Sequence, residues 1–328
     1  MKTNTMKRIA VFTSGGDSPG MNACIRAVVK KSLAENIQIF GVMRGYQGLI
    51  EGDVIELSYH NIASIIQKGG TILKSARSQD FMTKEGREKA FETLSKLKID
   101  GVVAIGGDGT FTGASVFMNE FDVPFIGLPG TIDNDLFGTD NTIGYDSALN
   151  TVVEAVDKIR DTATSHDRLF IVEVMGRDAG FIALRSGIAV GAGAILVPET
   201  PTYIETLINQ LKNDFRADKK SNIVIVSEGD DFGGAYKVAE HIKKEFNHFD
   251  IRVSVLGHMQ RGGSPSAYDR VLASRLGVAS VDALLSGRKG EMIGVVNNQL
   301  KYTSFEQSTK HHKTLNKDLL ELATILGQ

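Results

Sequence analysis

Short runs of apolar residues alternate with stretches of helical periodicity along most of the chain. Strands are predicted for the apolar runs at residues 9–12, 37–43, 101–105, 123–128, 169–174, 194–197, 223–226, 252–256 and 293–296. Helices are predicted at residues 22–33, 91–97, 149–159, 181–190, 267–285 and 315–326. Because the strands are apolar throughout and alternate with helices, we expect parallel sheets that helices cover on both faces.

The length of 328 residues favours two domains of ordinary size. No proline-rich linker, charge block or simple repeat marks a boundary between them. The region 140–256 could form a second α/β unit that is inserted into the first.

The composition of the chain argues against several kinds of binding partner and metal site. The chain carries 37 Lys and Arg residues against 39 Asp and Glu, a net charge of −2, so bulk charge gives no case for nucleic acid or an anionic membrane. The one cysteine, Cys24, permits neither an intrachain disulfide nor a cysteine-based zinc site. The N-terminal apolar run is too short for a secretory signal and no run predicts a membrane span, so we expect a cytoplasmic protein.

Polar, glycine-rich segments follow nearly every predicted strand. They occupy residues 13–20, 44–48, 106–110, 129–135, 175–177, 227–229 and 257–263. Ligands of open α/β sheets bind at the carboxyl ends of the strands. Ordinary glycine-rich turns would explain one or two such segments, but seven with complementary chemistry predict a binding site.

Two of these segments suggest phosphate and metal chemistry. Gly106–Gly107–Asp108–Gly109–Thr110 places an acid among glycines, so its backbone could cradle phosphates while Asp108 faces a metal held by them. Thr131, Asp133 and Asp135 alternate, and in extended backbone they would share one face. One carboxylate could then lie near magnesium and the other accept a hydroxyl proton, although a solvated turn is the alternative.

Arginines supply the positive charge that phosphoryl transfer needs. Candidates in or beside glycine- and serine-rich loops are Arg77, Arg168, Arg177, Arg252 and Arg261. Any one of them alone would be interpreted as a surface charge. The prediction depends on several of them lying at the same strand ends.

Together these segments resemble the ATP-dependent 6-phosphofructokinase family, from about residue 7 to residue 300. The segments that carry the resemblance are residues 13–22, 69–77, 106–110, 129–135, 164–177 and 255–265. The resemblance implies two Rossmann-like α/β/α domains with mainly parallel sheets and the active site in the cleft between them. An ATP-binding domain would comprise 1–140 plus 257–308, and a fructose-6-phosphate-binding domain 141–256 plus 309–328.

The implied activity is transfer of the γ-phosphoryl group of MgATP to the 1-hydroxyl of fructose 6-phosphate. The catalytic group would be Asp133 as general base with Arg77, Thr131 and Arg177, and magnesium would be held by Asp108 and Asp135. The ATP site would comprise Gly16, Arg77, Ser78, Gly107, Asp108, Gly109 and Thr110. The sugar-phosphate site would comprise Thr131, Ile132, Asp133, Arg168, Met175, Gly176, Arg177, Glu228, Arg252, His258, Met259, Gln260 and Arg261.

The resemblance also implies a homotetramer, in which Arg168 and Arg252 reach the sugar 6-phosphate bound by a neighbouring subunit. An allosteric effector site for ADP or phosphoenolpyruvate would use Arg26, Lys30, Arg160, Glu199 and Lys219. The chain departs from the family at Tyr59, Ala217 and Ser221, where basic residues are usual, and at Ser78, where an aromatic residue often supports the nucleotide.

Other functions fit the sequence less well. Pyrophosphate-dependent members tend to carry Asp at position 109 and Lys at 130, whereas Gly109 and Gly130 here favour ATP. NAD kinases and diacylglycerol kinases share the Gly-Gly-Asp-Gly-Thr motif but lack the combination of 129–135 with 257–263. A catalytically silent sugar-phosphate sensor would not need the three aspartates. A nicotinamide oxidoreductase is disfavoured because the first loop is not G-x-G-x-x-G and Arg44, not an acid, follows the second strand.

Overall fold

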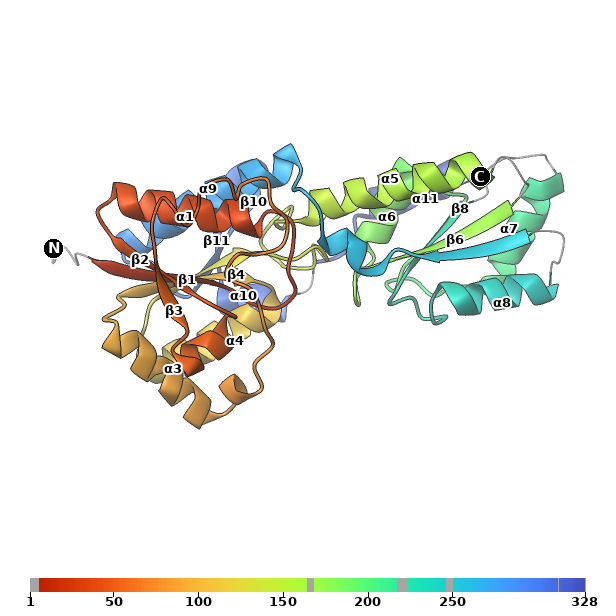
Figure 1. Ribbon diagram of the computed structural model, residues 1–328. Coiled ribbons are helices and arrows are strands. Elements are labelled where there is room, and N and C mark those ends of the chain that lie inside the picture. The colour runs from red at the N-terminus through yellow and green to blue at the C-terminus, as the bar shows by residue number, and fades with distance from the viewer. Residues whose placement is uncertain (1–5, 164–167, 217–222, 246–249, 312, 328) are drawn as a thin grey trace. The chain divides into compact units, whose positions relative to one another are not determined.

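The computed structural model describes residues 6–163, 168–216, 223–245, 250–311 and 313–327 (Figure 1). The chain divides into two compact units. The bounds of unit 1 are Met1–Ile132, Leu136–Asp146 and Arg261–Lys313, and those of unit 2 are Asp133–Asp135, Ser147–Gln260 and Thr314–Gln328. Each unit has its own sheet, so the expected α/β class with two mainly parallel sheets is confirmed.

The sheet of unit 1 has seven strands in the order β11-β10-β5-β4-β1-β2-β3. Their bounds are β1 Arg8–Thr13, β2 Gln38–Val42, β3 Val54–Leu57, β4 Gly101–Gly106, β5 Phe125–Pro129, β10 Glu291–Val296 and β11 Gln299–Ser304. The central strands are parallel, whereas β3 and β11 pair antiparallel to their neighbours at the two edges. Because the central strands are parallel, the carboxyl ends of β1, β4 and β5 lie next to one another at the same end of the sheet. The polar segments begin there.

Helices cover both faces of this sheet, as Figure 1 shows. On one face, α1 (Met21–Ala34) and α9 (Ala267–Leu285) pack together and share a core that includes Ile25 and Leu276. On the other face, an aromatic core that includes Phe111, Phe117 and Phe305 joins the helices to the sheet. The helices of that second face are α2 (Tyr46–Glu51), α3 (Lys84–Lys96), α4 (Asp108–Phe121) and α10 (Phe305–Lys310), with a short 3-10 helix η1 at Asp80–Met82.

The sheet of unit 2 has four strands, all parallel, in the order β7-β8-β6-β9. Their bounds are β6 Arg168–Val174, β7 Ala194–Leu196, β8 Ile223–Ser227 and β9 Asp250–Val255. The amphipathic helices α7 and α8 bury Leu207, Leu211, Val238 and Ile242 against one face. The remaining bounds are α5 Tyr145–Ala163, α6 Phe181–Ala189, α7 Ile204–Arg216, α8 Ala235–Glu245, η2 Gly257–Arg261 and α11 Lys317–Leu326.

All nine predicted strands and all six predicted helices are present, with shifts at their ends. The sequence pattern missed β3, β11, α2, α4, α7, α8 and α10. Within the described ranges, none of the helices combines the length and the apolar character that crossing a membrane requires.

Candidate active site

The two glycine-rich segments of unit 1 lie side by side because their strands are neighbours. In the β1–β4 register, Thr13 is opposite Ile105, and residues 13–20 and 106–110 follow directly. The Ser14 backbone N–H donates to the Ile105 carbonyl at 2.9 Å, so the pairing continues past the end of β1. The structure therefore brings together the two segments in which phosphate binding was predicted.

The segment 106–110 is not the free loop that we expected. β4 ends at Gly106, α4 begins at Asp108, and only Gly107 separates them. A Cβ atom added at Gly107 or Gly109 would meet nothing within 4 Å, so the backbone of this first turn faces open space. Such a turn presents N–H groups and the positive end of a helix dipole, which together favour an anion.

Asp108 occupies the first position of α4 with an exposed side chain. Its Oδ1 atom accepts a hydrogen bond from the Gly109 backbone N–H at 2.7 Å. This bond fixes the carboxylate beside the open turn. A ligand there would meet the Asp108 carboxylate at the start of the helix, with the Gly109 N–H already bonded to that carboxylate.

Arg261 lies against the first glycine-rich segment. Its Nη1 atom donates to the Asp17 carbonyl at 3.2 Å. A Cβ atom at Gly16 would come within 2.6 Å of that same nitrogen, so only glycine leaves the guanidinium room in this position. Gly16 and Arg261, predicted for the ATP and sugar sites respectively, are thus in contact within unit 1.

Arg77 is exposed, whereas the next residue, Ser78, makes two hydrogen bonds within the protein. Ser78 donates its hydroxyl to Gln47 Oε1 at 2.7 Å and accepts the Phe81 backbone N–H at 3.2 Å. Position 78 thus provides an anchor where an aromatic residue often stands. The nearest aromatic contact is between Phe81 and Tyr46, whose rings stack with centroids 3.9 Å apart.

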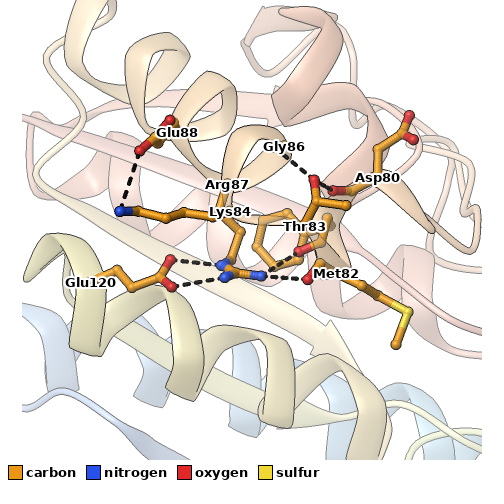
Figure 2. Close-up of polar contacts among 9 residues, drawn as sticks. Asp80, Met82, Thr83, Lys84, Gly86, Arg87, Glu88 and Glu120 are labelled. Atoms are coloured by element: carbon orange, nitrogen blue, oxygen red, sulfur yellow. Dashed lines mark hydrogen bonds and ion pairs between the residues drawn. The ribbon is translucent and has the colours of Figure 1, made fainter.

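The residues after Ser78 are held by Arg87 (Figure 2). Arg87 donates to both carboxylate oxygens of Glu120 at 2.6 and 2.8 Å, and also to the carbonyls of Phe81 and Met82. The hydrogen bond with Arg87 lowers the pKa of Glu120. The start of α3, the end of α4 and η1 are therefore joined by one guanidinium.

The segment 129–135 is not extended, which corrects the expectation that Thr131, Asp133 and Asp135 alternate along one face. Residues 132 and 133 form a bend, and Asn134 has a φ of +55°. Ile132 is fully buried, and Asp133 is only 7% exposed. The chain passes from unit 1 to unit 2 between these two residues. The bend thus places a carboxylate in a largely water-free position.

In unit 2, the loops after β6 and β8 are joined by Glu228. Its Oε1 atom accepts the backbone N–H groups of Gly176 at 3.2 Å and Arg177 at 2.8 Å. Arg177 has a φ of +55°, and a Cβ atom at Gly229 would lie 2.0 Å from the Arg177 carbonyl oxygen, so the loops are in close contact. The exposed Arg177 side chain is presented by a fixed backbone.

Gln260 joins a third loop to this pair. Its buried amide accepts the Met175 backbone N–H at 3.2 Å and donates to the Gly257 carbonyl at 3.0 Å. His258 and Met259, in the same 3-10 helix, are exposed. The structure therefore brings together Met175, Gly176, Arg177, Glu228 and the segment 257–260 at the carboxyl edge of the small sheet, with the Gln260 side chain turned into the protein.

Arg168 and Arg252 lie near the amino ends of their strands, which corrects the expectation that the candidate arginines lie at the same strand ends as Arg177. Arg168 begins β6 and Arg252 lies near the start of β9. Asp250 holds them together, accepting from Arg168 Nε at 3.0 Å and Arg252 Nη2 at 2.8 Å. The hydrogen bond with Arg252 lowers the pKa of Asp250. The seven residues of β6 span about 20 Å between Arg168 and Met175. Arg252 pairs with Phe170, so it lies two residues nearer to that end.

The predicted effector residues are divided between the units. Arg26 and Lys30 lie one turn apart on α1 in unit 1, and Arg160 and Glu199 belong to unit 2. The Glu199 carboxylate accepts the Gly180 backbone N–H. Lys219, Ala217 and Ser221 lie outside the described residues. Tyr59 is 60% exposed on the segment after β3. The effector site stays a prediction.

The described part of the chain contains no group of three or more His, Cys, Asp or Glu side chains arranged to hold a metal ion. Magnesium in nucleotide sites ordinarily takes one or two protein carboxylates and completes its shell with phosphate oxygens and water. The exposed Asp108 beside an open helix N-terminus fits that pattern.

Comparison with known proteins gives consistent results. The family model described as Phosphofructokinase matches residues 8–284. ATP-dependent 6-phosphofructokinase 2 of Bacteroides thetaiotaomicron is 54% identical over 97% of this chain and 98% of its own. ATP-dependent 6-phosphofructokinase 1 of Thermus thermophilus is 52% identical over 98% of this chain and 100% of its own.

Solved structures agree on the fold. Phosphofructokinase from Saccharomyces cerevisiae matches with a TM-score of 0.88 and 36% identity over 98% of this chain, which spans 46% of the yeast chain. A pyrophosphate-dependent phosphofructokinase from Marinobacter aquaeolei matches with a TM-score of 0.84 and 24% identity over 98% of this chain and 91% of its own. That second likeness concerns the fold alone.

Proposed function

The chain belongs to the phosphofructokinase family, and on that premise we propose that it transfers the γ-phosphoryl group of MgATP to the 1-hydroxyl of D-fructose 6-phosphate. The products are fructose 1,6-bisphosphate and ADP, and the reaction is a step of glycolysis. The observation that carries the proposal is identity above 50% over nearly the full length of relatives named ATP-dependent 6-phosphofructokinase.

The nucleotide side of the proposed reaction uses the first turn of α4. Gly107, Gly109 and Thr110 are the proposed contacts of the phosphates, and the open space at Gly107 and Gly109 leaves room for them. Asp108 is the proposed ligand of the magnesium ion that arrives with ATP, together with Asp135. Bound magnesium neutralises phosphate charge. Arg77, beside Ser78, supplies positive charge for the same ligand, and Gly16 supplies a backbone that a ligand can approach closely. The sugar-site residue Arg261 lies against Gly16.

On the sugar side, Asp133 is the proposed general base. Its carboxylate accepts the proton of the 1-hydroxyl as the oxygen forms its bond to phosphorus. The low exposure of Asp133 supports this role, because a base shielded from bulk water keeps its orientation. The proposed sugar contacts are the backbone and side chains of Thr131, Ile132, Met175, Gly176, Arg177, Glu228, His258, Met259, Gln260 and Arg261.

The donor is proposed to be ATP, not pyrophosphate. A Cβ atom at Gly109 would point into open space at the start of α4, so an aspartate there would fill it with negative charge. A Cβ atom at Gly130 would already lie 3.0 Å from Ile105 Cγ2 and Met21 Cε, so a lysine would crowd the core. Gly109 thus leaves the start of α4 free for a nucleoside, and Gly130 fits a space in which a lysine would clash.

We further propose a cytoplasmic homotetramer in which Arg168 and Arg252 bind the sugar 6-phosphate of a neighbouring subunit. Their place near the amino ends of the strands supports this arrangement. About 20 Å of strand separates Arg168 from Met175, and about 16 Å separates Arg252 from the loops of its own chain. Regulation by ADP or phosphoenolpyruvate through Arg26, Lys30, Arg160, Glu199 and Lys219 is proposed on the resemblance alone.

A coupled assay for fructose 1,6-bisphosphate tests the proposed function. The purified protein is given fructose 6-phosphate and magnesium with either ATP or pyrophosphate at equal concentration. We expect product with ATP and little with pyrophosphate. A greater rate with pyrophosphate would reverse the donor assignment. Absence of the bisphosphate with either donor would contradict the proposed function.

A further inference from the structure

Asn22 is a buried polar side chain to which the proposed chemistry gives no role. It is the second residue of α1 and is only 2% exposed. Its neighbours Met21, Ala23 and Cys24 are buried and apolar. An amide in such surroundings is costly unless its hydrogen bonds are satisfied, so its partners indicate what it does.

The side-chain hydrogen bonds of Asn22 all go to one irregular segment. Its Nδ2 atom donates to the carbonyls of Lys68 and Gly69, each at 3.1 Å, and its Oδ1 atom accepts the Ile72 backbone N–H at 2.8 Å. Residues 68–72 belong to neither a helix nor a strand. One side chain therefore provides bonds that regular secondary structure would otherwise supply.

The same segment is held at three further points. The Thr13 hydroxyl, at the end of β1, bonds to the Lys74 carbonyl at 2.7 Å and to the Thr71 hydroxyl at 2.9 Å. The Arg44 backbone N–H donates to the Leu73 carbonyl at 2.7 Å. A Cβ atom at Gly69 would lie 2.2 Å from the Gly263 carbonyl oxygen, so the segment also touches the loop that carries Arg261.

These contacts fix the backbone on both sides of Arg77. Lys74 is fixed by Thr13 on one side, and Ser78 is fixed by Gln47 and Phe81 on the other. Beyond Ser78, Arg87 binds the carbonyls of Phe81 and Met82, as Figure 2 shows. Only residues 75–77 lie between the two anchors, so any movement of the first anchor is transmitted to Arg77.

We propose that Asn22 is a positioning residue for nucleotide binding, which fixes residues 68–74 through its three backbone hydrogen bonds and so holds Arg77 against the phosphates. This inference rests on the proposed function and on the assignment of Arg77 to the nucleotide. Asn22 itself is buried and would act only through the backbone of this segment.

One substitution removes the donor group of Asn22 and keeps the size of the side chain. Asn22→Asp keeps the shape and keeps an oxygen to accept the Ile72 N–H. The NH₂ group is replaced by an oxygen that faces the carbonyls of Lys68 and Gly69, and three oxygens then repel one another. The exposed Asn119 on α4 offers a control with the same change of charge, Asn119→Asp.

Three measurements on the full chain test the proposal. We expect Asn22→Asp to raise the Kd of a non-hydrolysable MgATP analogue about tenfold or more, as misplacement of a binding group does, and to leave the Kd of fructose 6-phosphate within about twofold. Native trypsin cleavage after Lys74 and Arg77 should become faster. In an Arg77→Ala background, Asn22→Asp should weaken nucleotide binding no further, because both changes remove the same interaction. Asn119→Asp should match the wild type throughout.

If Asn22→Asp does not fold, Thr13→Val releases the same segment at Lys74 and should produce the same pattern. Unchanged nucleotide affinity and cleavage would overturn the proposal, and so would equal weakening of both substrates or an additive effect with Arg77→Ala. Wild-type formation of fructose 1,6-bisphosphate is measured in parallel. If the wild type makes none, the proposed function fails, whereas a working wild type with an unaffected Asn22→Asp variant contradicts only the inference about Asn22.

Discussion

Among single residues, Asp133 has the most specific proposed role, because proton transfer from the sugar hydroxyl would pass through its carboxylate. We expect Asp133→Ser to lower kcat by about 10²- to 10⁴-fold, the usual contribution of a positioned general base. The Kd of fructose 6-phosphate should change little, since the base acts only as the new bond forms. Steady-state kinetics and equilibrium binding check this prediction, and an unchanged kcat would remove the assignment.

Asp230 is a buried acid outside the proposed chemistry, and it makes a pH-dependent contribution to stability. It is 5% exposed, accepting the Thr202 hydroxyl at 2.7 Å and the Phe232 backbone N–H at 3.0 Å. Burial raises its pKa above the ordinary aspartate value, and these two hydrogen bonds oppose the rise only in part. The folded protein therefore binds this proton more tightly than the unfolded chain does.

The sign of the effect follows from that difference. The stability that Asp230 contributes through its proton is complete below the unfolded pKa and is lost as pH rises through the higher folded pKa. Asp230→Asn carries no titrating proton and escapes this loss. We therefore expect its Tm, measured relative to the wild type, to rise between pH 3 and pH 7. A difference in Tm that stays constant or falls over this range would contradict the prediction.

Sequence reasoning found the residue types at the site but not the direction of each side chain. Gly16, Asp108 and Arg177 could be found because glycine, acid and arginine stand directly after predicted strands. Gln260 stands in the same kind of segment, yet its side chain bonds to the Met175 and Gly257 backbone. Asn22 was missed because the only available signal was a polar residue in an apolar helix, and its partners are about 50 residues away along the chain.

At the scale of elements, the close packing of α1 against α9 depends on Gly277. A Cβ atom there would lie 2.7 Å from Ala27 Cβ and 2.8 Å from the Cys24 carbonyl oxygen. Alanine would favour the helix but force the two helices apart, and overpacking of a core usually costs about 1–3 kcal/mol. We expect Gly277→Ala to lower the free energy of unfolding by about 1 kcal/mol or more in urea denaturation.

The exposed Val278 on the same helix provides the control for this substitution. Val278→Ala shortens an exposed side chain of α9, and we expect a change in the free energy of unfolding within about 0.5 kcal/mol. If Gly277→Ala proved as stable as the wild type, α1 and α9 could separate without cost, and the contact would not define their spacing.

The elements that the sequence missed share a physical cause. In α4, Gly109 and Gly113 interrupt the helix propensity, although Phe111, Ala114 and Phe117 keep the spacing of a buried face. The edge strands β3 and β11 are short or mostly exposed, so they lack the continuous apolar run of a central strand. Central strands could be predicted because both of their faces are buried, so that every residue along the strand is apolar.

At the scale of the whole molecule, the order of motifs along the chain does not follow the division into units. The chain crosses between units after Ile132, Asp135, Asp146, Gln260 and Lys313. Because several of these crossings fall inside or beside the motifs and none falls in a proline-rich linker, composition gave no boundary. The predicted strands did indicate the end of the small sheet at which each arginine lies. Arg168 directly precedes the run 169–174 and Arg252 begins the run 252–256, whereas Arg177 follows a run. In the structure Arg168 begins β6 and Arg252 is the third residue of β9.

The position of Arg252 leads to a prediction about the assembly. If a site combines Asp133 of one subunit with Arg252 of its neighbour, subunits carrying Asp133→Ser and Arg252→Ala should complement each other. In randomly mixed tetramers, one site in four receives both intact residues, so activity should recover to about a quarter of the wild-type value. Mixing Asp133→Ser with Arg177→Ala is the matched control. Because those two residues are proposed to serve the same site from the same chain, no mixed site is complete and no activity should return. Recovery in both mixtures, or in neither after verified subunit exchange, would contradict sharing of sites through Arg252.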